Sequence, residues 1–135
     1  MQAIRFALEP DLPAEEFRDV LIASTLAERR PANDLERLAQ MLRNADLVVT
    51  ARDGAKLVGI SRAITDFAYC CYLSDLAVDV AYQRQGIGKR LIEETRARAG
   101  EAATLILVAA PAAERYYPKI GMRPIASCWS IPRAR

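Results

Sequence analysis

The N-terminal part of the chain carries the hydrophobic patterns of one strand followed by two helices. Residues 2–8 alternate weakly between apolar and polar side chains and predict a strand. A helix is predicted from Asp11 to Arg29, and Pro31 ends it because the residue before a proline avoids helical geometry. Asn33 or Asp34 can cap a second helix. The apolar positions at helical spacing are Phe17, Val20, Leu21, Leu35, Leu38, Ala39 and Leu42.

A run of strands is predicted in the middle of the chain. Leu47–Ala51 and Lys56–Ile64 are β-rich, and Asp53-Gly54 between them is a strong signal for a hairpin turn. Tyr69–Val80 predicts a third, long strand. Alternation along this strand would place Tyr72, Leu76 and Val78 on one face and Leu73 on the other.

The C-terminal part predicts further helices and strands in alternation. A helix is expected over Gly86–Ala99, with Gly100 as its stop signal. The apolar run Thr104–Ala109 predicts a strand covered on both faces. A short helix from Pro111 to about Lys119 and a strand over 122–131 follow. The order of elements predicts an α/β fold with a mixed sheet whose central strands are covered by helices.

Composition narrows the class of protein. The 135 residues (1–135) fit one domain, and the net charge of +2 argues against a general nucleic-acid-binding protein. Histidine is absent, which excludes histidine-based zinc sites, Ser-His triads and a histidine base. The cysteines, Cys70, Cys71 and Cys128, form no metal-binding pair or disulfide framework. No apolar stretch is long enough to span a membrane and no signal peptide is recognisable, so we expect a cytoplasmic protein.

The segment Leu76–Leu91 contains the most informative local pattern. A strand ends there, a polar loop with two glycines follows, and an amphipathic helix begins. Backbone N–H groups at the start of a helix lack an internal partner and, with the helix dipole, form an anion-binding site. Gly86 and Gly88 let the backbone approach a phosphate, while Arg84 and Lys89 add positive charge.

Two well-known phosphate-binding loops do not fit this segment. A Walker A loop would need glycine at position 83 and serine or threonine at position 90, where this chain has Gln83 and Arg90. A dinucleotide-binding fingerprint would need a small residue at position 91, which is Leu91. The remaining pattern is Q-x-x-G-x-G between a strand and a helix.

That pattern, at Gln83–Gly88, resembles the pyrophosphate loop of the GCN5-related N-acetyltransferase (GNAT) superfamily. The preceding LSDLAVDVAYQRQGIG is similar to the central strand and loop of that family, and Ala113–Met122 (AERYYPKIGM) is similar to its A-x-x-F-Y-x-K-x-G-F segment. The two segments span Leu73–Met122, more than a third of the chain. Residues 57–63, Asp66 and 74–78 further resemble the small arylalkylamine acetyltransferases.

The resemblance implies a single-domain, mostly antiparallel mixed sheet flanked by helices, with a V-shaped splay between the two strands that hold the cofactor. Acetyl-CoA would be the cosubstrate, without a metal. Amides from Gln85 to Lys89 would bind its pyrophosphate, and the strand backbone would pair with its pantetheine arm. The implied cofactor-binding residues are Leu76, Val78, Val80, Gln83, Arg84, Gln85, Gly86, Ile87, Gly88 and Lys89. The chain departs from the family pattern at Ala110, where asparagine is common, and at Met122, where phenylalanine is usual.

The resemblance also assigns catalytic roles. Tyr117 falls on the position of the general acid, and the amide of Val78 would stabilise the oxyanion of the thioester. Asp75 is a candidate base because alternation places it with Leu73 and Ala77 on one side of the sheet, where burial would raise its pKa. A surface or salt-bridged aspartate, or an ordered water as the base, is the alternative. Asp79 is expected to be a turn or cap residue.

The expected activity is direct transfer of an acetyl group from acetyl-CoA to a primary amine of a small molecule. Alternatives are an acetyltransferase acting on peptide or protein amines and a non-catalytic acyl-CoA-binding module. Cys70 and Cys71 are expected to be buried small hydrophobes rather than nucleophiles, because no histidine could activate them. Trp129 and Tyr69 are candidates for an acceptor pocket, for core packing or for a dimer contact. A homodimer is a further expectation from the resemblance.

Overall fold

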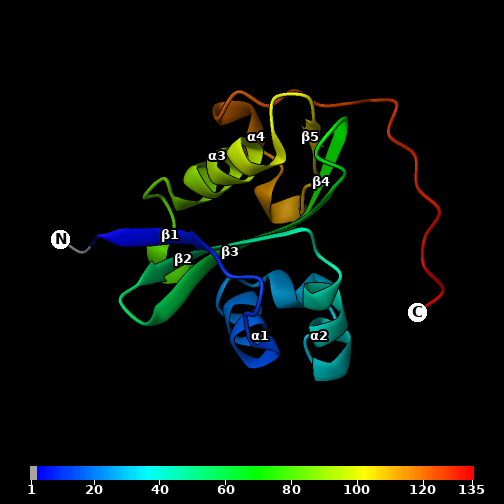
Figure 1. Cartoon of the computed structure of the whole chain (residues 1–135). Helices are drawn as coiled ribbons and strands as arrows, with labels where there is room; N and C mark the ends of the chain where they lie inside the picture. Colours follow the sequence, from blue (N-terminus) through cyan, green and yellow to red (C-terminus); the bar gives the residue numbers. More distant parts are fainter. Residues whose placement is uncertain (1–2) are drawn as a thin grey trace.

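The computed structural model describes residues 3–135 and shows a five-stranded sheet in the order β1-β2-β3-β4-β5 (Figure 1). Neighbouring strands are antiparallel except β4 and β5, which are parallel. The expected mixed, mostly antiparallel sheet is therefore confirmed. The strands are β1 (Ile4–Leu8), β2 (Leu47–Asp53), β3 (Lys56–Thr65), β4 (Cys70–Val78) and β5 (Thr104–Ile106). The helices are α1 (Ala14–Ala23), α2 (Leu35–Arg43), α3 (Ile87–Ala99) and α4 (Tyr116–Lys119), with 3₁₀ turns η1 (Leu26–Arg29), η2 (Val80–Tyr82) and η3 (Pro111–Ala113).

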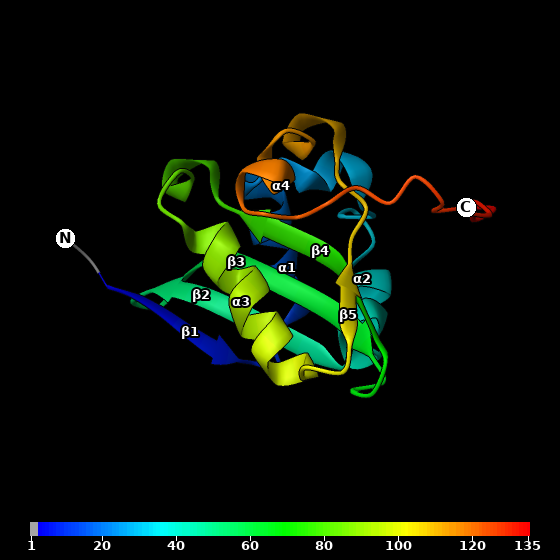
Figure 2. The ribbon, with the colours of Figure 1, turned by 90° about the horizontal axis from the view of Figure 1, so that it is seen from above.

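Helices cover both faces of the sheet (Figures 1 and 2). On one face, α1 and α2 bury Phe17, Leu21 and Leu38 against Val48 and Ile60 of the sheet. On the other face, α3 buries a second set of apolar residues against β2, β3 and β4: Ile87, Leu91, Ile92 and Ala99. No helix among residues 3–135 is both long and apolar enough to cross a bilayer. The sheet thus separates two hydrophobic cores.

A β-bulge in β4 changes which side chains share a face. Asp75 lies opposite Arg62 and Leu73 lies opposite Ala63, so Ser74 is an extra residue in β4. Beyond it the alternation reverses: Leu73 packs in the same cluster as Leu76, against α3. The predicted grouping of Leu73 with Asp75 on one face is therefore wrong, as is the prediction that Leu73 and Leu76 lie on opposite faces.

The first predicted helix is split in two. Helix α1 ends with Ser24 as its C-cap, and Thr25 adopts a left-handed conformation with φ of 71° before η1 begins. A β-branched residue rarely adopts positive φ, and this turn cannot be read from hydrophobic spacing. Asp34 caps α2 by accepting a hydrogen bond from the Arg37 amide at 3.1 Å, as predicted.

The C-terminal strands are shorter than predicted. β5 contains only Thr104–Ile106, and half-buried residues alternate with exposed ones along it, so it is not covered on both faces. The segment 122–131 forms no strand, and residues 123–135 are exposed throughout. Within the described residues the sheet ends at β5, and no further strand lies beyond it. Without one, apolar residues on these segments remain at the surface.

Candidate active site

Helix α3 begins at a loop whose backbone is shaped for an anion. Arg84 and Gly86 both have positive φ, 66° and 82°, and Gly86 is the N-cap. The first main-chain bond of the helix runs from the Arg90 amide to the Gly86 carbonyl at 3.0 Å. The amides of the first three helical residues therefore precede this ladder. The left-handed Gly86 followed by the helical Ile87 directs successive N–H groups into one concavity, which favours a phosphate.

A glycine on the facing strand lets α3 lie close to the sheet. A Cβ on Gly59 of β3 would lie 3.1 Å from Leu91 Cδ1 and 3.3 Å from Ile87 Cγ2. Leu91 occupies the position where a dinucleotide-binding loop needs a small residue. In this chain the small residue is Gly59 on the strand, so helix and strand still pack closely. Sequence analysis missed Gly59 because its role depends on a helix that lies far along the chain.

The side chains around the loop divide into two groups. Gln83 donates from Nε2 to the Val78 carbonyl at 3.1 Å and so ties the loop to the end of β4. Arg90 bonds to Glu94 at 3.0 Å and covers the ring of Phe6 at 4.7 Å. Arg84, Gln85 and Lys89 are exposed at the mouth of the loop. No acidic residue lies in the first turn of α3, so the site keeps its positive potential.

Strand β4 presents main-chain groups to an edge that opens beside this loop. The Asp79 amide bonds to the Val58 carbonyl of β3 at 2.8 Å. Because main-chain groups alternate in direction along a strand, those of Val78 and Leu76 face the opposite edge. On that side the register between β4 and β5 stops at Tyr72 and Ile106 (Figure 2). Two of the predicted pantetheine contacts thus face the space left beyond β5.

Val80 is placed differently from the prediction. Strand β4 ends at Val78, and Val80 begins the 3₁₀ turn η2, so the predicted strand to residue 80 is too long. Asp79 caps this turn by accepting a hydrogen bond from the Ala81 amide at 2.9 Å, as expected for a cap residue. The backbone of Val80 therefore does not continue the row formed by Leu76 and Val78.

The two tyrosines of α4 point to different surroundings. Tyr117 packs against the core cluster that contains Leu73, Cys71 and Ile92, and burial raises the pKa of its phenol above the ordinary value. The hydroxyl of Tyr116 instead lies 3.0 Å from the position that a Cβ on Gly88 would take. The Lys89 amide donates a hydrogen bond to it, although burial still raises the pKa of Tyr116. Their rings meet edge to face at 5.3 Å.

Asp75 is enclosed by two arginines. Its side chain is fully buried; Arg30 Nε donates to Oδ1 and Arg62 Nε donates to Oδ2. Arg30 also donates to the Ser74 carbonyl at 2.7 Å, and Arg62 donates to the Ser74 hydroxyl at 3.0 Å. The cluster thus joins the segment before α2 to the bulge of β4. This is the salt-bridged alternative for Asp75, because both carboxylate oxygens already accept charged hydrogen bonds.

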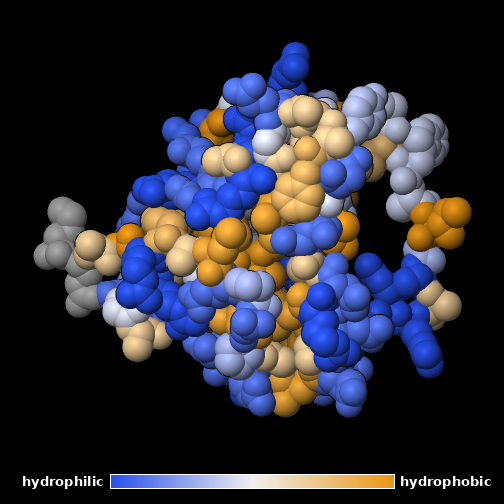
Figure 3. Space-filling view, viewed as in Figure 1, coloured by the Kyte–Doolittle hydropathy of each residue, from blue (hydrophilic) through white to orange (hydrophobic). Residues whose placement is uncertain are grey.

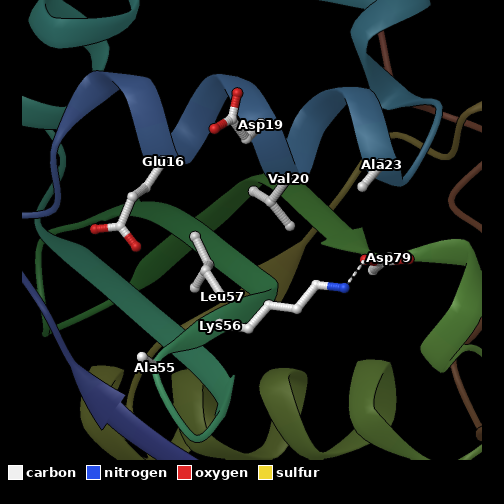
Figure 4. A pocket seen from close by; sticks show the side chains of 8 residues that line it. All are labelled: Glu16, Asp19, Val20, Ala23, Ala55, Lys56, Leu57 and Asp79. Carbon is white, nitrogen blue, oxygen red and sulfur yellow. Dashed lines mark ion pairs between the residues drawn. The ribbon is translucent and has the colours of Figure 1, made fainter.

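Two cavities lie near these elements. One of about 920 Å³ runs beside α3 from Lys89 to Arg96 and is bordered by residues 120–125. The other, of about 400 Å³, lies between α1 and the ends of β3 and β4 (Figure 4). Glu16, Asp19 and Asp79 line the second cavity, and Lys56 pairs with Asp79 at 3.6 Å. Both volumes suit small ligands or parts of larger ones.

The remaining predicted residues differ in their exposure. Cys71 is buried as predicted, whereas the prediction that Cys70 is buried is wrong, because it lies exposed at the start of β4. Cys128 is also exposed. Ala110 caps η3 with its backbone only, since alanine has no side chain to reach a ligand. Tyr69 and Trp129 are 80% and 90% exposed, which excludes core packing among the three alternatives for them.

Comparisons with known proteins agree with this arrangement. Residues 13–128 match the family described as acetyltransferase (GNAT) domain. A histone acetyltransferase of Glycine max is 33% identical over 75 residues, which cover 47% of this chain and 32% of that protein. The match therefore spans about a third of the length of that relative.

Solved structures show the same fold. A GNAT-family acetyltransferase from Streptococcus pneumoniae TIGR4 superimposes with a TM-score of 0.78 at 23% identity, over 98% of each chain. An aminoglycoside N-acetyltransferase in complex with CoA superimposes with a TM-score of 0.74 at 12% identity, over 100% of this chain and 97% of that one. At these identities the likeness concerns the fold.

Proposed function

This chain belongs to the GNAT family of acetyl-CoA-dependent acetyltransferases, and we propose that it transfers an acetyl group directly from acetyl-CoA to a primary amine of a small molecule. One observation carries the proposal: the unpaired amides at the start of α3 follow directly, after the turn η2, on the end of β4, where the main-chain groups of Leu76 and Val78 face away from β3. Coenzyme A requires such an arrangement, because its diphosphate can bind the amides at the start of α3 while its extended pantetheine arm pairs with the main chain of β4.

The cofactor-binding residues are assigned on this basis. The diphosphate binds the amides of Ile87 and Gly88 and takes the place of the Tyr116 hydroxyl at the amide of Lys89, and the side chains of Arg84 and Lys89 add charge. Gln85 and Gly86 shape the loop, while Gln83 holds it to β4 and Val80 contributes no strand pairing. The nucleotide half extends into the 920 Å³ cavity, where Lys89 and Arg96 suit its phosphate.

The chemistry follows from this placement. A neutral amine attacks the thioester carbonyl, and the Val78 amide stabilises the oxyanion that forms. When the intermediate collapses, the C–S bond breaks and Tyr117 donates its phenolic proton to the departing sulfur. The proton lost by the amine leaves through ordered water. Asp75 is assigned a positioning role, because it is fully buried and both of its oxygens accept hydrogen bonds from Arg30 and Arg62.

The acceptor is proposed from the 400 Å³ cavity. The carboxylates of this cavity already pair with cations, Glu16 with Arg52, Asp19 with Arg18 and Asp79 with Lys56, so a cationic amine would share them. The apolar floor can hold an alkyl or aromatic group. This is compatible with the arylalkylamine resemblance of residues 74–78. The histone acetyltransferase relative supports the other candidate acceptor, a peptide amine.

The test is a panel of acceptors with acetyl-CoA, monitored by release of free thiol. Aromatic and aliphatic monoamines, a polyamine, aminoglycosides and lysine-containing peptides cover the alternatives. The proposal expects thiol release with small cationic amines and little with peptides. Turnover with peptides but not with small amines would show that the acceptor is a peptide amine. Binding of CoA without transfer to any amine would indicate a non-catalytic module.

A further inference from the structure

The cluster around Asp75 contains one more positive charge than its carboxylate needs. Arg62 lies opposite Asp75 on β3, its side chain is 8% exposed, and it already donates to Oδ2. Arg30 brings a second guanidinium group to Oδ1 from a position 45 residues earlier in the chain. One guanidinium group neutralises one carboxylate, and removing a further charge from water costs free energy. Neutralisation of Asp75 alone therefore does not explain why Arg30 is buried here.

Arg30 is turned inward although its charged neighbours face water. It is the C-cap of η1 and leads toward α2, over which the surface is largely hydrophilic (Figure 3). Glu28 and Arg29 are exposed, whereas the side chain of Arg30 is only 21% exposed. Its Nη1 donates to the Arg29 carbonyl at 2.8 Å. The guanidinium group is thus held by its own segment in an orientation that points at β4.

The bulge of β4 supplies the reason for this orientation. Ser74 is the extra residue of the bulge, and an extra residue is left without a partner in the ladder of the sheet. Its carbonyl must accept a hydrogen bond from another group. Arg30 Nη2 donates to that carbonyl at 2.7 Å, and Arg62 Nη2 donates to the Ser74 hydroxyl at 3.0 Å. One planar group of Arg30 therefore binds both the Asp75 carboxylate and the Ser74 carbonyl.

The bulge decides which amides of β4 face away from β3. The Asp79 amide bonds to the Val58 carbonyl at 2.8 Å, so the main-chain groups of Leu76 and Val78 face the opposite edge. Without the extra residue, β4 would be shifted by one position along β3. The amides of Leu76 and Val78 would then point at β3, and those of Ala77 and Asp79 would take their place.

We propose that Arg30 is a positioning residue for acetyl transfer, an inference that rests on the proposed function. By binding the Ser74 carbonyl, Arg30 holds the bulge in place. The bulge in turn directs the amides of Leu76 and Val78 toward the pantetheine arm and the thioester oxygen. Arg30 acts through the backbone of β4 and touches neither acetyl-CoA nor the amine.

The kinetic test is Arg30→Met, assayed with the best acceptor of the amine panel. The pair of Asp75 and Arg62 that remains is neutral, so folding should survive, as circular dichroism would verify. We expect kcat to fall about 100-fold, as misplacement of reacting groups by about 1 Å can cause, while the Kd of CoA stays within a few-fold. Arg30→Lys keeps the charge but not the planar group, and its kcat should stay at least about tenfold below that of the unmodified chain. Arg29→Met, the same change at the exposed neighbour, is the control and should leave kcat unchanged.

NMR of the ¹⁵N-labelled chains separates positioning from a general loss of stability. When CoA is added to Arg30→Met, the amides of Ile87 and Gly88 should shift as in the unmodified chain, whereas Leu76 and Val78 should lose most of their shift. A purely structural role would weaken all four signals together and would overturn the proposal.

Full activity of Arg30→Met or of Arg30→Lys, or unaltered shifts of Leu76 and Val78, would also overturn it. Absence of transfer to every amine would contradict the proposed function instead. The signals of Leu76 and Val78 in the ligand-free chains would then decide on Arg30, because they should still differ between Arg30→Met and the unmodified chain. If Arg30→Met did not fold, Arg30→Lys would be compared in the same way.

Discussion

At the residue scale, the proposed acid and its neighbour differ in environment although they are adjacent in sequence. Tyr117 packs with core residues of β4, and burial raises the pKa of its phenol. A raised pKa keeps the proton on oxygen at neutral and mildly alkaline pH, so Tyr117 stays able to donate it. Tyr116 lies at the start of α3, where its hydroxyl accepts from the Lys89 amide.

Replacement of Tyr117 should slow the chemical step. We expect Tyr117→Phe to lower kcat about 100-fold, the lower end of what acid catalysis contributes, with the Kd of CoA nearly unchanged. For the unmodified enzyme, turnover should decline only above about pH 10, because the pKa is raised above that ordinary tyrosine value. Steady-state kinetics measure kcat and its pH dependence, and isothermal titration calorimetry measures the Kd of CoA.

Tyr116→Phe is the matched control. It should leave kcat within a few-fold and change mainly the Kd of CoA, since the hydroxyl lies beside Gly88 at the phosphate site. If both substitutions lowered kcat equally, or if Tyr117→Phe left it unchanged, Tyr117 would not be the acid.

Replacement of Asp75 distinguishes a positioning role from a catalytic one. Asp75→Asn leaves Arg30 and Arg62 without their buried counter-charge and should lower the free energy of unfolding by about 3–5 kcal/mol. Below the melting temperature of the variant, kcat should stay within about tenfold of the kcat of the unmodified enzyme. The pH profile of kcat should keep its shape. Urea titration and pH-dependent kinetics provide the measurements. Loss of the acidic limb of the profile from a folded variant would identify Asp75 as the base.

At the element scale, the end of α1 carries local strain. Thr25 has φ of 71°, which costs a β-branched residue about 1–2 kcal/mol. Thr25→Gly should therefore raise the free energy of unfolding by about 1 kcal/mol, after allowance for the entropy of glycine. Glu28→Gly in η1 is the control and should lower it. Thermal denaturation of both variants is the measurement. A lower free energy of unfolding for Thr25→Gly would show that the backbone at Thr25 is not strained.

The elements set by local signals could be predicted from the sequence. The hairpin at Asp53-Gly54, the cap at Asp34 and the loop before α3 depend on residues close in the chain, and all three are present. The bulge at Ser74 and the role of Gly59 were missed. Both depend on partners in other elements, Arg62 with Arg30 and Leu91 with Ile87, which periodicity does not reveal.

At the scale of the whole molecule, a mixed sheet covered by helices was predicted from the order of elements, whereas the order of strands within the sheet was not. The length of the C-terminal strands was not predicted either, because a strand needs a neighbour and residues 122–131 have none within the described chain. The loop and Tyr117 were proposed from the sequence, and their roles stay predictions. The arginines around Asp75 were not proposed, since nothing local links Arg30 to β4.

Cofactor binding should stabilise the whole molecule. At a CoA concentration 100 times its Kd, the free energy of unfolding should rise by about 2.7 kcal/mol. For a domain of this size that corresponds to an increase in Tm of roughly 8–13 °C, measured by differential scanning fluorimetry. Pantetheine, which lacks the diphosphate, is the control and should give a much smaller shift. Equal shifts of Tm with CoA and with pantetheine would show that most of the binding free energy comes from contacts outside the α3 loop.

The measurement that addresses the central claim is an NMR titration of the ¹⁵N-labelled chain with coenzyme A. Amides at the start of α3, Ile87, Gly88 and Lys89, together with Leu76 and Val78 of β4, should show the largest shifts. The NMR signals of amides in α2, which lies on the opposite face of the sheet, should not shift. Saturation with coenzyme A that left the α3 amides unshifted would contradict the proposed cofactor site and the activity that depends on it.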